Sequence, residues 1–166
     1  MQRERTIGEQ KILFDREATI DLYRNTLTAA DGDWCGCASC KNFALQRTKI
    51  YPVPFLQFLE ELGIDPFREW EAFDYDFDSG NQNKHLYGGW FLFVGELVVG
   101  VENPPKHATG TFTHWFTDSF PAPALPTDMR ICAVEFRVEV QWVLREAVER
   151  SPNDVSTQHR ASLGPG

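Results

Sequence analysis

The sequence ICAVEFRVEVQWVL, residues 131–144, alternates apolar and polar side chains with a period of two. The apolar row consists of Cys132, Val134, Phe136, Val138, Val140 and Trp142, and the polar row of Glu135, Arg137, Glu139 and Gln141. This alternation is typical of an antiparallel strand that turns one face to the core and the other to water. Because Cys132 belongs to the apolar row, we predict that its thiol is a small buried hydrophobe and not a metal ligand.

Two other segments have strong strand signals. Residues 86–94 carry apolar side chains on both faces, which predicts a central strand covered on both sides. Residues 109–117 alternate β-branched threonines with a row of Phe112, His114 and Phe116, and such threonines suit a pleated surface.

Two weaker strands are expected at residues 69–77 and 19–24. In the first, aromatic residues would face the core and acidic residues would face water. The inward row is Phe73, Tyr75 and Phe77, and the outward row is Asp74, Asp76 and Asp78. Three carboxylates on one extended strand are too far apart to wrap a small cation, so we interpret the outward row as a solvated face.

Helical signals lie in the first half of the chain. Phe55, Phe58, Leu59 and Leu62 recur at helical spacing after Pro54, and Gly63 follows as a stop signal. We also expect a helix from residue 38 to about residue 47, beginning inside a cluster of cysteines.

The length and composition indicate one domain. With 166 residues, the chain is long enough to bury a core without disulfide bonds. We expect an α+β fold at residues 11–150, an antiparallel sheet of about four to six strands with two or three helices on one face. Residues 1–10 are predicted to be a mobile tail and residues 151–166 a disordered one.

The charge pattern excludes some classes of partner. The chain has 24 acidic and 16 basic residues, a net charge of −8, which argues against nonspecific binding to nucleic acid. The first residues contain no apolar run, and the apolar stretch at residues 86–101 is interrupted by glycines. We therefore expect no signal peptide, no membrane span and a cytoplasmic location.

The segment CGCASC, residues 35–40, places three thiols within six residues. Cys37 and Cys40 have the spacing with which a tight turn presents two sulfurs to a tetrahedral zinc ion, and Cys35 could add a third. The candidates for a fourth ligand are His85, His107, His114 and His159. We favour His114 or His85, since each lies on a predicted strand, and take Cys35, Cys37, Cys40 and His114 as the predicted structural zinc site.

Two other interpretations of the cysteines stay open. The thiols could be packed or weakly redox-active without a metal, or one of them could be a catalytic nucleophile. If a metal binds, three thiolates weaken its power as a Lewis acid, which favours a structural role over a catalytic one.

The segment HLYGGWF, residues 85–91, combines adjacent glycines with aromatic residues. Glycine inside a strand often marks close approach by a ligand or by another part of the chain. If the protein has a small-molecule pocket, we expect it here, beside His114. The predicted lining is Tyr87, Gly88, Gly89, Trp90 and Trp115. The alternative is that a ring such as that of Trp70 packs over the glycines.

The order of these motifs resembles that in a group of small bacterial and phage proteins without an established activity. The resemblance covers residues 19–143 and depends on four segments. These are CGCASCKNF at 35–43, YP at 51–52, FLQFLEELGID at 55–65 and LYGGW at 86–90. It implies one intact domain of bacterial or phage origin and no catalytic residue.

The sequence contains no complete catalytic set, which favours a protein that is not an enzyme. We expect a binding or regulatory module that recognises another protein through exposed aromatic and acidic residues. A second hypothesis is a ligand-binding protein or enzyme with a pocket near Gly88, Gly89 and His114. A third is an acidic mimic of nucleic acid in bacterial or phage defence.

Overall fold

The computed structural model describes residues 1–25, 36–76, 83–100, 107–121 and 129–144. These residues form an α+β fold around an antiparallel sheet, as predicted. The helices are α1 (Arg16–Asn25), α2 (Ala38–Ile50) and α3 (Val53–Leu62). The strands are β1 (Gln2–Ile7), β2 (Gln10–Asp15), β3 (Glu71–Asp74), β4 (Lys84–Val99), β5 (His107–Thr109), β6 (Phe112–Thr117) and β7 (Ile131–Gln141).

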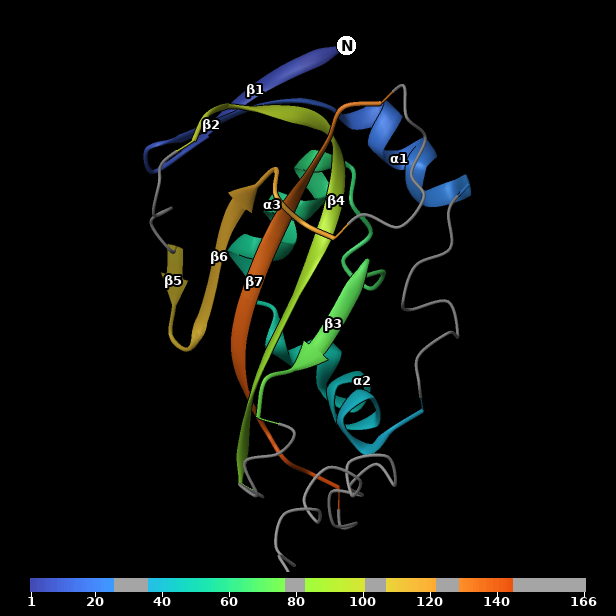
Figure 1. Ribbon diagram of the computed structural model, residues 1–166, viewed down its shortest axis with the longest axis vertical. Coiled ribbons are helices and arrows are strands. Elements are labelled where there is room, and N and C mark those ends of the chain that lie inside the picture. The colour runs from blue at the N-terminus through green and yellow to red at the C-terminus, as the bar shows by residue number, and fades with distance from the viewer. Residues whose placement is uncertain (26–35, 77–82, 101–106, 122–128, 145–166) are drawn as a thin grey trace, which may run out of the picture.

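The described sheet has seven strands in the order β1-β2-β4-β7-β6-β5, with β3 also paired to β4. Its centre is the long β4–β7 pair, whose register runs from Lys84 opposite Gln141 to Val94 opposite Ile131. Helices α2 and α3 lie behind the sheet in Figure 1, and α1 lies beside the upper half of β4. The central strand predicted at residues 86–94 lies in β4 and the alternating strand predicted at residues 131–144 in β7, so the two predicted strands are neighbours in the sheet.

Aromatic rings make up most of the core between the sheet and α3. The ring of Tyr51, just after α2, meets those of Phe91, Phe112 and Phe136 edge-on, at centroid distances of 5.7, 5.9 and 5.5 Å. Its hydroxyl donates to the buried carboxylate of Glu69 (2.6 Å). That carboxylate also pairs with the Arg47 guanidinium (3.0 Å), so the charge removed from water has a charged partner.

Helix α1 covers a gap along the edge of β4. Strand β2 pairs with the upper part of β4 and β3 with the lower part, which leaves Leu92 and Val94 between them. The Leu92 amide donates to the Tyr23 hydroxyl and the Val94 amide to the Thr19 hydroxyl, each at 3.0 Å. Two side chains of α1 thus replace the missing strand.

The strand predicted at residues 19–24 is wrong, because these residues lie in α1. Asp15 begins this helix by accepting the Ala18 amide (3.2 Å), a bond that also keeps the pKa of the Asp15 carboxyl below its ordinary value. Leu22 and Tyr23, which alternation would put on opposite faces of a strand, are both buried.

The tail predicted at residues 1–10 is corrected by the structure, which has strand β1 there. Backbone pairing with β2 orders it although most of its side chains are exposed, so composition alone gives no signal. Gln10 is buried, and its side-chain amide donates to the Phe116 carbonyl (2.9 Å) and accepts the Phe116 amide (3.0 Å). This amide connects the start of β2 to the outer edge of β6.

Replacing Tyr23 by Phe is expected to destabilise the fold by about 1–3 kcal/mol, because it leaves the buried Leu92 amide without an acceptor. Tyr75→Phe is the matched control, since Tyr75 is 44% exposed. Urea unfolding measures both changes. If Tyr23→Phe and Tyr75→Phe lower the unfolding free energy equally, α1 does not act as a substitute strand for β4.

Glu69 is expected to make stability depend on pH. Burial raises the pKa of its carboxyl above the ordinary 4.5. A raised folded-state pKa contributes stability below about pH 4.5, and that contribution is lost as pH rises through the folded pKa. The unfolding free energy of the wild type minus that of Glu69→Gln should therefore fall as pH rises above 4.5. Urea titrations across this range measure it, and a difference that grows with pH would overturn the assignment.

Candidate functional site

The first turn of α2 carries the two described thiols of the cysteine cluster. Cys37 occupies the position before the helix in an extended conformation (φ −67°, ψ 165°), and its carbonyl accepts the Lys41 amide (3.0 Å). Cys40 follows one turn later, and both side chains are partly buried. Cys35 lies outside the described residues. Cys37 thus precedes the helix, and Cys40 lies in its first turn.

Between these cysteines, Ser39 is bonded to a buried acid. Its hydroxyl donates to Asp74 Oδ2 (2.7 Å), and His85 Nδ1 lies 2.6 Å from the same oxygen. The Asp74 and His85 side chains are only 2% and 1% exposed. The other carboxylate oxygen accepts the Asp76 amide (2.9 Å). Helix α2, strand β3 and strand β4 therefore meet at one carboxylate.

The imidazole of His85 has one nitrogen satisfied and one not. An ionised carboxylate only accepts hydrogen bonds, so Nδ1 is the ring nitrogen that donates to Asp74, and in the tautomer that this bond selects Nε2 is the nitrogen with the lone pair. Nε2 is buried and has no hydrogen-bond partner among the described residues. The ring also stacks near Trp142, with a centroid distance of 4.5 Å.

A second set of hydrogen bonds fixes the same turn of α2. The Tyr87 hydroxyl donates to the Ser39 carbonyl (3.0 Å), and burial raises the pKa of this hydroxyl, so it stays a donor. The Asn42 side chain donates to the Gln141 carbonyl (3.2 Å) and accepts the Val143 amide (2.8 Å). The first turn of α2 with its two thiols, residues 37–40, is called the cysteine turn below. These bonds connect it to β4 and to the end of β7.

The structure does not bring His114 together with Cys37 and Cys40. His114 lies on β6 and packs against Phe55 and Phe58 of α3, at ring-centroid distances of 4.9 and 6.0 Å. In the part of the chain that the structure describes, no three His, Cys, Asp or Glu side chains form a group able to hold a metal ion. Instead, His85 is the histidine linked to the cysteine turn, through Asp74 and Ser39.

Cys132 of β7 is buried in the main hydrophobic core, as predicted. Burial raises the pKa of its thiol to about 11, because the charged thiolate is poorly solvated there. This thiol is therefore unsuited to metal binding or nucleophilic chemistry at neutral pH.

The pocket predicted beside the paired glycines is filled by the protein's own rings. A side chain at Gly88 would meet the Tyr75 ring at 2.6 Å, and one at Gly89 would meet the Phe136 ring at 2.9 Å. The predicted lining is also divided between the two faces of the sheet. Tyr87 packs with the rings on the helix side, whereas Trp90 belongs to a second cluster with Leu22 and Trp70. Trp115 contacts the Arg137 guanidinium (5.3 Å).

The solvated row predicted for Asp74, Asp76 and Asp78 is wrong at Asp74, the central residue of the site. Phe73 packs on Trp90 (5.6 Å) in the cluster away from α2 and α3, so Asp74 turns towards the helices. Asp76 accepts the Leu86 amide (2.7 Å), and Asp78 lies outside the described residues. The sequence offers one signal for this site, because His85 follows the acidic segment closely along the chain. Alternation alone does not tell whether the acidic or the aromatic row faces the helices.

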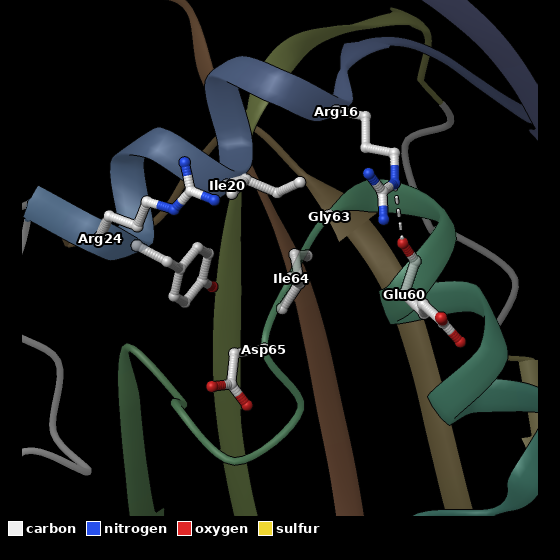
Figure 2. A pocket seen from close by; sticks show the side chains of 8 residues that line it. Arg16, Ile20, Arg24, Glu60, Gly63, Ile64 and Asp65 are labelled. Atoms are coloured by element: carbon white, nitrogen blue, oxygen red, sulfur yellow. Dashed lines mark hydrogen bonds between the residues drawn. The ribbon is translucent and has the colours of Figure 1, made fainter.

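A cavity of about 280 Å³ lies between α1 and the end of α3 (Figure 2). Its cationic groups already have partners: Arg16 donates to the Glu60 carbonyl (3.4 Å) and Arg24 pairs with Asp21 (3.2 Å). Arg16 therefore caps the carbonyl end of α3, and the cavity has the features of a helix junction.

The comparisons with known proteins identify no relative. No family model matches the chain, no curated protein matches it, and no solved structure matches its fold. None of the described helices is long and apolar enough to cross a membrane.

Replacing Asp74 by Ala is expected to lower the unfolding free energy of chelator-treated protein by about 3 kcal/mol. It removes the acceptor of Ser39, His85 and the Asp76 amide at once, and bonds to a buried charge are worth more than neutral ones. Asp118→Ala, an exposed acid, is the control and should change stability by less than about 0.5 kcal/mol. If both variants unfold at the same urea concentration as the wild type, the carboxylate does not hold the three elements together.

Proposed function

We propose that this protein is a noncatalytic binding module whose cysteine turn, at the start of α2, holds a structural zinc ion. The observation that carries the proposal is the position of Ser39 between Cys37 and Cys40, bonded to the buried Asp74–His85 pair. Two thiols and an imidazole are the donors that zinc prefers, and Cys35 is the predicted further ligand.

The hydrogen bonding of the cluster supports a structural role. Catalytic Ser or Cys nucleophiles lie beside a base that takes their proton. Here the Ser39 hydroxyl and the His85 imidazole both bond to the same Asp74 oxygen, so the hydroxyl is an anchor and not a nucleophile activated by that ring. An ion at the turn would fix the N-terminal end of α2, which lacks a side-chain cap.

A protein partner is supported by the sheet face opposite α2 and α3. Tyr75 is 44% exposed, and the Arg137 guanidinium lies 5.0 Å from its ring and 5.3 Å from that of Trp115. Aromatic residues and arginine are the side chains enriched at protein interfaces. Arg137 also lies between Glu135 and Glu139, and this mixture of signs counts against a mimic of nucleic-acid phosphates on this face.

Metal analysis and thiol titration of the reduced full-length chain test the zinc proposal. We expect about one zinc per chain, with Cys35, Cys37 and Cys40 unreactive towards a thiol reagent until a chelator is added. Cys132 should stay unreactive even then, because it is buried and its pKa is raised to about 11.

Cys40→Ser should lose the metal, whereas Cys132→Ala, the matched control, should keep it. Zinc that binds only the folded protein should raise the unfolding free energy by about 4 kcal/mol at a thousand times its dissociation constant. Metal-free protein with three reactive thiols, whose stability does not respond to added zinc, would remove the proposal.

A further inference from the structure

The polar contacts of the histidines differ, and this difference bears on which of them would supply a nitrogen ligand to the proposed zinc ion. Sequence spacing leaves several histidines as candidates, of which His85 and His114 lie on strands with described side chains. They differ in what surrounds the ring. His114 lies among the rings of Phe55, Phe58 and Phe112, while His85 shares a carboxylate with the serine between the two thiols.

We propose that His85 Nε2 is a ligand of the zinc ion bound by Cys37 and Cys40, and that Asp74 is the positioning residue behind it. This inference rests on the proposed function. Metal-binding histidines usually donate their second ring N–H to a carboxylate, which fixes the tautomer and makes the free nitrogen a better ligand. The His85–Asp74 pair has this arrangement, with a distance of 2.6 Å.

The burial of His85 is a second, independent reason. A buried nitrogen with a lone pair and no partner is unfavourable, because it has lost its water without gaining a bond. His85 is 1% exposed and its Nε2 has no hydrogen-bond partner among the described residues. A zinc ion on Nε2 would remove this cost.

The position of His85 in the sheet puts the ring on the correct side. His85 and Tyr87 are two residues apart on β4 and face α2, where the Tyr87 hydroxyl reaches the Ser39 carbonyl (3.0 Å). Among the described residues the two thiols and this imidazole do not form a metal-binding group, so zinc binding would require the thiols to approach Nε2.

The test uses full-length protein labelled with ¹⁵N in histidine, and zinc is the only ligand added. NMR spectra that correlate ring protons with ring nitrogens should show the Nε2 resonance of His85 move to the range of metal-bound imidazole. The His114 signals should stay in place. His85→Gln assigns the signal, and His114→Gln is the matched control.

Zinc affinity, measured by competition with a chromophoric chelator, gives the second readout. His85→Gln should weaken binding by at least about 100-fold, and Asp74→Asn by about 10- to 100-fold, the effect of losing a carboxylate behind a ligand. His114→Gln should bind as tightly as the wild type. If His85→Gln does not fold, the wild-type spectra still decide the assignment.

The outcomes separate this inference from the proposed function. If the wild type binds no zinc, the proposed function fails and the inference fails with it. If zinc binds through the thiols while the His85 ring signals do not move, only the His85 assignment is wrong. Movement of the His114 signals instead would overturn the His85 assignment and support His114, the histidine in the zinc site predicted from the sequence.

Discussion

The buried carboxylate of Asp74 is the constraint on which the lower half of the molecule depends. A carboxylate removed from water is stable only when its oxygens accept hydrogen bonds, and here the donors are Ser39 of α2, His85 of β4 and the Asp76 amide. Because these donors come from separate parts of the chain, satisfying one charge fixes the position of α2 on the sheet. The hydrogen bond from Ser39 to Asp74 therefore also fixes the position of the cysteine turn.

Much of the fold could be predicted from periodicity. The alternation in β7 identified the strand, its buried face and the burial of Cys132, and Pro54 and Gly63 marked the limits of α3 closely. The errors were at edges. Strand β1 has almost no buried side chains, so it gives no apolar pattern. Helix α1 was not recognised because two of its buried groups, Thr19 and the Tyr23 hydroxyl, are polar and accept hydrogen bonds from the edge of β4. Local patterns do not carry such long-range pairings.

The candidate site could be predicted only in part. Local spacing was enough to find Cys37 and Cys40 at the start of a helix, because a helix places residues three apart on one side. Asp74 was assigned to the wrong face. Both faces of β3 contact aromatic clusters, and alternation separates two rows of side chains without showing which row faces the helices. The contact between Asp74 and His85 could not be predicted, because it depends on the pairing of β3 with β4, which places Asp74 opposite Tyr87, two residues from His85.

The central proposal is a zinc ion at the cysteine turn with at least one imidazole among its ligands. Zinc X-ray absorption spectroscopy of the wild-type protein tests this most directly, since it reports the ligand atoms without any substitution. It should give sulfur scatterers at about 2.3 Å together with an imidazole nitrogen at about 2.0 Å. A shell of sulfur alone, or of light atoms alone, would contradict it.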